Sequence, residues 1–328
     1  MEDRKPKISL LIYTYNRAHL IEESIHSVLN QSYRDFELVL VNNGSTDNTR
    51  QVLDKYAEHE KVRVIHVEKN LGSAGGMNFA FDNIGGEWFA QMGDDDLLLP
   101  NCFERMMRVL TEVDPTVTAI TCNAMSSIDR SLTGTGFDHD QYMPLEKIIL
   151  QGNGDFFAIT RTELLGEKRL NPELPGDANV LWYQIDAIAN RYYIHEALMI
   201  YNDAIGANES TVHSSVNAGI RIKRYQELLK EDFYWEVMKQ YNLKQYHARC
   251  LRGMYFMRAA GNMDAMNRYK AMLLSSGPGL KSRIFASCIL AIPSSFLSKL
   301  YEFSGKSVFS EGLFRIFFKK HSLIGQSA

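Results

Sequence analysis

Closely spaced cysteines are missing from this 328-residue sequence. Its four cysteines are widely scattered and form no Cys-x-x-Cys motif; they are Cys102, Cys122, Cys250 and Cys288. Secreted domains that depend on disulfides carry regularly spaced cysteines instead. The pattern is typical of reduced thiols, so we expect a cytoplasmic protein without a disulfide framework.

Long hydrophobic runs are missing as well. No uninterrupted apolar stretch reaches the roughly 18 residues that a transmembrane helix needs, so a membrane span is not predicted. The first residues, Met1 to Lys5, are polar and lack the apolar core of a signal peptide. Both absences favour a protein that stays inside the cell.

An excess of basic charge is also lacking. The chain has 36 basic and 39 acidic side chains, which gives a net charge of −3. Nucleic-acid-binding domains usually show a strong basic excess, so no nucleic-acid partner is predicted. The charge is unevenly distributed, however, because residues 279–328 carry +5 and leave −8 for the rest.

A glycine-rich phosphate loop is absent after the first predicted strand. Residues 14–20 read Thr-Tyr-Asn-Arg-Ala-His-Leu and contain no glycine. A dehydrogenase would show a Gly-x-Gly-x-x-Gly motif at this point. A sugar nucleotidyltransferase would show a glycine-rich loop with lysine or arginine, so neither class is favoured.

Short apolar strands and amphipathic helices alternate up to about residue 215. Strands that are separated by helices of about 10–15 residues indicate βαβ units. We predict an α/β fold with a mainly parallel central sheet flanked by helices, in a catalytic domain of residues 1–215. The strand-like runs are residues 8–12, 36–41, 62–67, 87–92 and 117–122.

Beyond residue 215 apolar residues recur at helical spacing, which predicts a helical C-terminal region over residues 216–328. Several of these residues are methionines, including Met254, Met257 and Met266. Methionine commonly fills irregular gaps in cores, so we interpret them as core residues.

Polar clusters follow three of the predicted strands. They read Thr14-Tyr15-Asn16, Asn42-Asn43-Gly44-Ser45 and Gly93-Asp94-Asp95-Asp96. In sheets of this kind ligands bind beyond the carboxyl ends of the strands. Loops are polar in general, but that does not explain three consecutive acids, so we predict a ligand site here.

The three acids, Asp94 to Asp96, follow a buried strand directly. Adjacent carboxylates repel one another near a low-dielectric sheet, and a cation relieves that cost. Hard oxygen ligands suit Mg²⁺ or Mn²⁺, which bind through one or two carboxylates together with substrate phosphates. The alternative is that the acids cap the following helix, for which a single acid would suffice.

Five segments in order resemble the family 2 glycosyltransferases, which are inverting enzymes with the GT-A fold. The resemblance covers about residues 7–215. It implies a metal-dependent enzyme that transfers a sugar from a UDP- or dTDP-sugar to a hydroxyl group. The acceptor would be a glycan or a polyprenyl-linked oligosaccharide in surface polysaccharide biosynthesis. The segments are TYNR (14–17), SVLNQSYRDFELVLVNNGSTDNT (27–49), NLGSAGG (70–76), GDDDLLLP (93–100) and GDANVLW (176–182).

The resemblance also implies roles for single residues. Asn43 takes the place of an aspartate that binds the uracil imide in many members. Metal binding would fall to Asp95, Asp96 and His213, although a solvated loop histidine is the alternative for His213. The implied donor-binding residues are Tyr13, Thr14, Asn16, Asn43, Ser45, Gly72 and Asp94.

Asp177 corresponds in the resemblance to the general base of the spore-coat polysaccharide type of transferase. A carboxylate within hydrogen-bond reach of the acceptor hydroxyl takes its proton as the new bond forms. The alternative is an N-cap, because Gly176-Asp177 immediately precedes a helical stripe that begins at Val180.

Three positions depart from the family pattern. Asn42-Asn43 replaces the usual pair of aspartates, which removes a charge-assisted hydrogen bond to the donor base. Gly93 stands where the common version has its first acid, and Gly75-Gly76 resembles rhamnosyl- and galactofuranosyltransferases. The donor base and sugar stay open, and a catalytically weak sugar-nucleotide-binding or scaffold protein is the alternative function.

Residues 281–320 combine Phe, Leu and Ile with interleaved Lys and Arg. This composition suits amphipathic helices in a membrane interface, with the basic side chains at anionic headgroups. The alternative is packing on the catalytic domain or on another subunit. We expect a peripheral location on the inner face of the cell membrane, which fits a lipid-linked acceptor.

Overall fold

The computed structural model describes residues 7–174, 176–204 and 218–293. The chain divides into two compact units, with the boundary between residues 209 and 210. We refer to residues 7–204 as the sheet unit and to residues 218–293 as the helical unit. The domain boundary predicted at residue 215 lies outside the described residues and stays a prediction.

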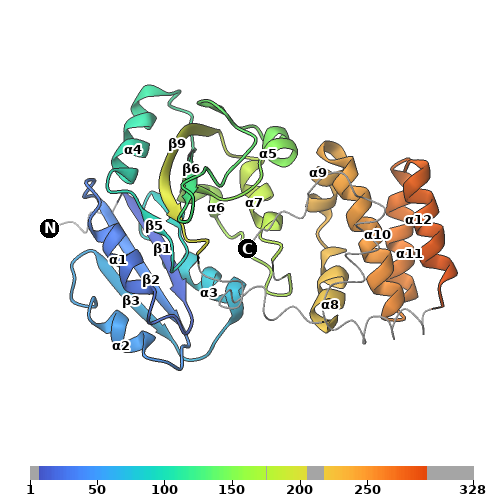
Figure 1. Cartoon of the computed structure of the whole chain (residues 1–328), viewed down its shortest axis with the longest axis horizontal. Helices are drawn as coiled ribbons and strands as arrows, with labels where there is room; N and C mark the ends of the chain where they lie inside the picture. Colours follow the sequence, from blue (N-terminus) through green and yellow to red (C-terminus); the bar gives the residue numbers. More distant parts are fainter. Residues whose placement is uncertain (1–6, 175, 205–217, 294–328) are drawn as a thin grey trace. The chain divides into compact units, whose positions relative to one another are not determined.

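One mixed sheet of nine strands forms the sheet unit (Figure 1). The strand order is β3-β2-β1-β4-β8-β6-β9-β5, and β7 pairs with β9. The strands are β1 (Ile8–Thr14), β2 (Phe36–Asn43), β3 (Val62–Val67), β4 (Trp88–Gln91), β5 (Leu97–Leu98), β6 (Ala119–Ser126), β7 (Gln141–Tyr142), β8 (Phe156–Arg161) and β9 (Arg191–Tyr201).

The α/β class is confirmed, and the parallel arrangement holds for the first four strands. β1 pairs in parallel with β2 and β4, and β2 with β3. β8 then inserts antiparallel between β4 and β6, so the sheet as a whole is mixed. The predicted fifth strand begins two residues later than expected, at Ala119, and continues to Ser126.

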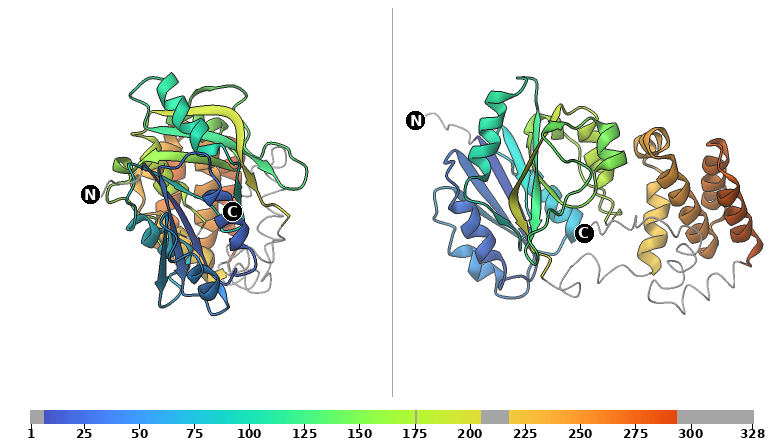
Figure 2. Two further views of the ribbon diagram at one scale, coloured as in Figure 1. Left: turned by 90° about the vertical axis from the view of Figure 1, so that its left-hand side faces the viewer. Right: turned by 45° about the horizontal axis from the view of Figure 1, so that its top comes forward.

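Helices cover both faces of this sheet (Figure 2). Alternate residues of β1 point to opposite faces, so Leu10 packs with one helix layer and Leu11 with the other. The first layer contains α1 (Ile21–Leu29), α2 (Thr49–Asp54) and α4 (Cys102–Glu112), and the second contains α3 (Gly72–Phe81), α6 (Thr162–Leu165) and α7 (Asn179–Asp186). The remaining helix of the sheet unit is α5 (Leu145–Gln151).

The carboxyl ends of the parallel strands meet at one edge of the sheet. Thr14, the last residue of β1, pairs with Asn42 of β2, and Leu11 pairs with Gln91, the last residue of β4. The polar clusters that follow these strands are therefore brought together. This edge is the place where the sequence predicts a ligand site.

The helical unit is an array of helices in which α10 contacts α8, α9, α11 and α12. Met254, Met257 and Met266 are buried, which confirms their interpretation as core residues. A Cβ at Gly253 would lie 2.5 Å from the Tyr269 ring, so glycine permits the close approach of two helices. The helices are α8 (Ala218–Leu228), α9 (Asp232–Tyr241), α10 (Leu243–Ala259), α11 (Met263–Ser275) and α12 (Leu280–Ala291).

None of the helices that the structure describes combines the length and the apolar character that crossing a bilayer requires.

Candidate active site

The turn between β1 and α1 is clamped onto the loop that follows β2. Asn16 adopts a left-handed conformation with φ 56°, which asparagine tolerates better than most residues. Its side-chain oxygen accepts a 2.7 Å hydrogen bond from the Thr46 backbone, and its own N–H donates to Ser45 Oγ at 3.0 Å. The Arg17 N–H donates to Thr49 Oγ1 at 3.2 Å. These bonds give the start of the Arg17 side chain a fixed position.

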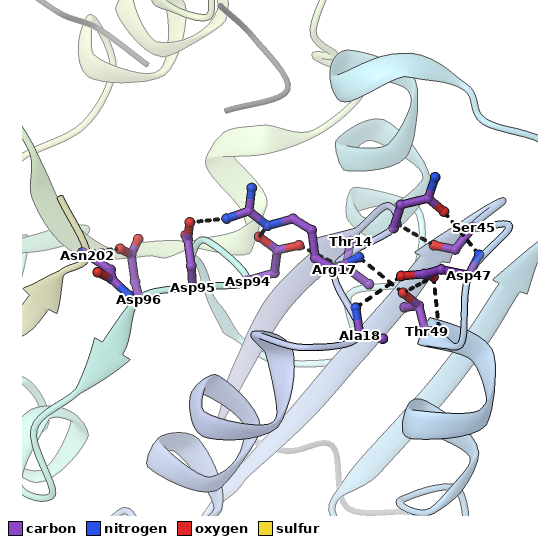
Figure 3. Close-up of polar contacts among 11 residues, drawn as sticks. Thr14, Arg17, Ala18, Ser45, Asp47, Thr49, Asp94, Asp95, Asp96 and Asn202 are labelled. Atoms are coloured by element: carbon purple, nitrogen blue, oxygen red, sulfur yellow. Dashed lines mark hydrogen bonds and ion pairs between the residues drawn. The ribbon is translucent and has the colours of Figure 1, made fainter. Parts of the chain in front are cut away.

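Asp94 and Asp95 are held by two side chains from the end of β1 and its turn (Figure 3). Thr14 Oγ1 donates a 2.5 Å hydrogen bond to Asp94 Oδ2. Arg17 Nε lies 3.0 Å from Asp94 Oδ1, and its terminal nitrogen Nη2 pairs with Asp95 Oδ2. One guanidinium therefore bridges two adjacent carboxylates.

Asp96 is bound from the opposite side of the triplet, as Figure 3 shows. Its Oδ1 accepts a 3.0 Å hydrogen bond from the backbone N–H of Asn202, which directly follows β9. Among the described residues no cationic side chain pairs with Asp96. Besides burial, the negative charges of Asp95 and Asp155 raise its pKa, and the backbone hydrogen bonds from Asn202 and Gly93 act in the opposite direction.

Burial dominates the acid–base behaviour of the triplet. It raises the pKa of Asp96 to about 7, and the charges of Asp95 and Asp155 act in the same direction. Burial also raises the pKa of Asp94 to about 6, against the opposing effects of Arg17 and the Thr14 hydrogen bond. Burial makes both carboxyls easier to protonate, and a cation bound beside them would favour their ionised forms.

Asn43 braces the start of α3. Its Nδ2 donates to Asn70 Oδ1 at 3.2 Å and to the Gly72 carbonyl at 3.0 Å, and its Oδ1 accepts from the Leu71 N–H at 3.1 Å. An amide oxygen has two lone pairs, and the described residues use only one of those on Asn43 Oδ1. A Cβ at Gly76 would lie 2.8 Å from Asn43 Nδ2, so the glycine-rich segment lets α3 approach the strand ends closely.

Tyr13 lies beside this brace near the end of β1. A Cβ at Gly76 would lie 3.0 Å from its ring, so Tyr13 packs directly against α3. Burial and, secondarily, the charge of Asp94 raise the pKa of the Tyr13 phenol to about 12. The structure thus brings together the predicted donor-binding residues Tyr13, Thr14, Asn16, Asn43, Ser45, Gly72 and Asp94 around the ends of β1, β2 and β4.

Asp177 is buried and lies two residues before α7. The helix begins at Asn179, and the residue before it, Ala178, already has helical dihedral angles, so the N-cap alternative for Asp177 stays open. The segment that leads to Asp177 is tied to α3, because Asn78 and the backbone of Leu170 exchange two hydrogen bonds of 2.8 Å. These hydrogen bonds and the packing of its side chain place Leu170 in the same layer as α3.

The capping alternative for the acidic triplet is wrong. The helix that follows, α4, begins at Cys102 with Asn101 at its N-cap, and β5 lies between it and the acids. The carboxylates of Asp94 to Asp96 therefore do not cap α4.

A metal site is only partly outlined by the described residues. Among them no group of three or more His, Cys, Asp and Glu side chains is arranged to hold a metal ion. His213 lies outside the described residues. Asp95 and Asp96 nevertheless fit Mg²⁺ or Mn²⁺, because these ions take one or two carboxylates together with substrate phosphates, and Asp96 pairs with no cationic side chain in the part of the chain that the structure describes.

Two residues at this site received no role from the sequence. Arg17 belongs to a recognised motif, but its pairing with Asp94 and Asp95 joins positions about 80 apart in the chain and has no local signal. Asp155 stands directly before β8, in the segment Gly152-Asn153-Gly154-Asp155, and its charge acts on Asp96. An acid between a glycine-rich turn and an apolar strand was a detectable signal of the same kind as the triplet.

Comparisons with known proteins agree with this arrangement. A family model described as glycosyl transferase family 2 matches residues 9–167, from β1 to just beyond α6. The GalNAc(5)-diNAcBac-PP-undecaprenol beta-1,3-glucosyltransferase of Campylobacter jejuni is 26% identical over 304 residues, which cover 90% of this chain and 96% of that protein. The putative teichuronic acid biosynthesis glycosyltransferase TuaG of Bacillus subtilis is 33% identical over 113 residues, or 34% of this chain and 45% of TuaG.

A solved structure shares the fold. TarS of S. aureus, residues 1–349 in complex with UDP-GlcNAc, superposes with a TM-score of 0.62 at 18% identity, over 93% of this chain and 92% of that one. At this identity the likeness concerns the fold alone. Together with the family match and the Campylobacter relative, it shows that residues 9–167 form a glycosyl transferase family 2 domain and that the chain has the GT-A fold.

Proposed function

We propose that the enzyme transfers a sugar, with inversion, from a UDP- or dTDP-sugar to a hydroxyl of a glycan or lipid-linked oligosaccharide. The observation that carries this proposal is the position of the carboxylates of Asp94 to Asp96. They lie at the carboxyl edge of the sheet, next to Thr14 and Arg17. That edge is where sheets of this class bind nucleotides.

The donor would bind across the ends of β1, β2 and β4. Asp94, held in place by Thr14, would accept hydrogen bonds from the ribose. The one acceptor position left on Asn43 would serve the base, in place of the aspartate that many family members use. A neutral amide makes a weaker hydrogen bond than a carboxylate, so the remaining contacts would supply more of the donor affinity.

Asp177 is the proposed general base. The acceptor oxygen attacks the anomeric carbon opposite the diphosphate, and its proton passes to the Asp177 carboxylate. The bond between the anomeric carbon and the diphosphate oxygen breaks, and the diphosphate leaves with the electron pair. A divalent ion held by Asp95 and Asp96 would neutralise the charge that develops on that diphosphate.

A polyprenyl-linked acceptor is supported by the name of the Campylobacter relative, which specifies an undecaprenol-linked substrate, and by its coverage of 90% of this chain. The last described helix offers a surface that suits such an acceptor. Leu280 and Ile284 are one helical turn apart on α12 and are 74% and 48% exposed. Lys281 and Arg283 are exposed beside them, so the helix combines apolar and basic side chains.

The membrane proposal is tested by flotation of the full chain on vesicles that contain anionic phospholipid. We expect the wild type to float and the double variant Leu280→Asp/Ile284→Asp to lose most of that binding. Met263→Asp, which changes an exposed apolar residue of α11, is the matched control and should still float. A wild type that never floats overturns the membrane proposal. Residues 294–320 of the predicted membrane-interfacial segment lie outside the described residues.

The enzymatic proposal is tested by thermal shift with UDP-, dTDP- and GDP-sugars, each with and without Mn²⁺, followed by turnover with a lipid-linked oligosaccharide. A ligand of the native state raises the melting temperature. We expect a shift for UDP- or dTDP-sugars that grows with Mn²⁺, and a product of inverted anomeric configuration. Binding without transfer or donor hydrolysis would favour the alternative, a sugar-nucleotide-binding scaffold.

A further inference from the structure

Arg17 is a buried cation at the centre of the acidic site. The residue is 8% exposed, and its guanidinium contacts Asp94 through Nε and Asp95 through a terminal nitrogen. The planar guanidinium of arginine presents several donors in a fixed fork geometry, so it can pair with two carboxylates at once. In this structure the site therefore contains its own counter-cation.

The backbone of Arg17 is fixed, and its side chain reaches from the turn after β1 to the loop after β4. The Arg17 N–H is bonded to Thr49, and Asn16 on one side and Ala18 on the other are bonded to the loop after β2. The two carboxylates come from the loop after β4. With the turn held in this way, an exchange of partners by the guanidinium would be a rotation of the side chain and not a movement of the turn.

A divalent ion would compete with Arg17 for the same oxygen atoms. Asp95 is a proposed metal ligand, and its Oδ2 is already paired with the guanidinium. Two cations within a few ångströms of each other repel strongly in a partly buried site. A metal ion alone would therefore bind weakly, because it would have to displace the guanidinium or tolerate its charge.

A nucleoside diphosphate resolves this competition. Its phosphate oxygens are good bidentate partners for a guanidinium, and they also complete the coordination of Mg²⁺ or Mn²⁺. We propose that Arg17 acts as an exchangeable counter-cation: it pairs with Asp94 and Asp95 in the ligand-free site and transfers to the diphosphate when the metal ion enters. Arg17 is then a positioning residue that makes the metal ion and the nucleotide bind together.

This inference rests on the proposed function and makes a separate thermodynamic claim. Two ligands that favour the same rearrangement raise each other's affinity by the same factor. If Arg17 is the group that rearranges, replacing it with an uncharged side chain must strengthen binding of the metal ion alone. The same replacement must weaken the coupling between metal ion and nucleotide.

The test measures Mn²⁺ affinity by electron paramagnetic resonance or calorimetry, with and without UDP, for the full chain and for Arg17→Met. We expect UDP to raise the Mn²⁺ affinity of the wild type at least about tenfold. Arg17→Met should bind Mn²⁺ alone about tenfold more tightly than the wild type, and the effect of UDP should shrink by a similar factor. Arg17→Lys, which retains the charge without the fork, should lie between the two and covers the case in which Arg17→Met does not fold.

The control is Arg161→Met. Arg161 also pairs with a carboxylate, Glu87, at 3.2 Å, and it stacks on the Trp88 ring at the start of β4, away from the acidic triplet. The Arg161→Met variant should bind Mn²⁺ as the wild type does. The inference is overturned if Arg17→Met or Arg17→Lys binds Mn²⁺ no more tightly than the wild type and UDP raises that affinity as much as in the wild type. This outcome would leave the proposed function intact. A wild type that binds no Mn²⁺ even with UDP overturns the metal proposal, and this inference with it.

Discussion

Thr14 Oγ1 and Asp94 Oδ2 are 2.5 Å apart, although 80 positions of the sequence separate the two residues. The bond joins the end of β1 to the loop after β4, and Thr14 is 1% exposed. It therefore fixes the position of the carboxylate that we propose as the acceptor of hydrogen bonds from the donor ribose. It also favours the ionised form of Asp94, whose pKa burial raises.

Thr14→Val should weaken donor binding. The substitution keeps the shape of the side chain and removes the hydroxyl, which leaves a buried carboxylate oxygen without its donor. Losing one partner of a buried hydrogen bond costs about 1–3 kcal/mol, so we expect the dissociation constant for UDP to rise about tenfold. Titration calorimetry measures this. Thr14→Ser keeps the hydroxyl and should bind nearly as well as the wild type; equal affinity for Thr14→Val would contradict the proposed role.

Asp96 gives a prediction about pH. Its pKa is about 7 in the folded protein, above the ordinary value for aspartate of about 3.9. The contribution of its neutral form to stability is therefore complete below about pH 4 and is lost as the pH rises through 7. In the absence of metal, Asp96→Asn should be more stable than the wild type at pH 8, by about 2–4 kcal/mol, and should lose this advantage at pH 4.

Urea unfolding with a chelator present, at pH 4, 6 and 8, measures the difference. Asp203→Asn is the control, because the pKa of Asp203 is shifted in the opposite direction: hydrogen bonds from Ser126 and Ser127 lower it. That substitution should not stabilise the protein at pH 8. A loss of stability of Asp96→Asn at pH 8 would mean that Asp96 is compensated as an ion in the folded state.

The first half of the sheet was predictable because its strands are buried on both faces. The run from Ile8 to Ile12 is almost continuously apolar, and β1 is correspondingly buried. The second half was not. β8 lies antiparallel between β4 and β6, and no local pattern in Phe156–Arg161 specifies which strands it will pair with.

The site was predictable to the extent that it depends on strand ends. The acids at 94 to 96 follow β4 as expected, and the polar residues after β1 and β2 lie at the same edge. The partner of each acid was not predictable, because Arg17 and Asn202 reach the triplet from distant parts of the chain. Asn43 was interpreted as a base ligand, but most of its hydrogen-bonding capacity is used to brace α3.

Two Arg–Asp pairs of the sheet unit have equal distances and different burial. Arg191 and Asp186 are 2.6 Å apart, with side chains 9% and 8% exposed; Arg169 and Asp82 are also 2.6 Å apart, with side chains 31% and 58% exposed. Removing one partner of a buried pair leaves an uncompensated charge. We expect Asp186→Ala to cost about 3–5 kcal/mol and Asp82→Ala at most about 1 kcal/mol.

Urea unfolding of both variants at neutral pH measures these costs. The double variant Asp186→Leu/Arg191→Met removes both charges and should be milder than Asp186→Ala, because no buried charge is left without a partner. Equal costs for the buried and the exposed pair would contradict this account. Because Asp186 is the last residue of α7, the buried pair also anchors the helix that follows Asp177.

Asp177→Asn tests the proposed base. The amide keeps the size of the side chain but cannot take the acceptor proton, so kcat should fall by about 10²–10⁴-fold while the dissociation constant for UDP changes little. Steady-state kinetics and calorimetry on the same preparation separate the two effects. Glu167→Gln, which neutralises an exposed acid of the same segment, should keep full activity. If Asp177→Asn retains most of its turnover, the proton passes to another group; if it loses UDP binding instead, Asp177 belongs to the donor site, and the base has to be sought elsewhere.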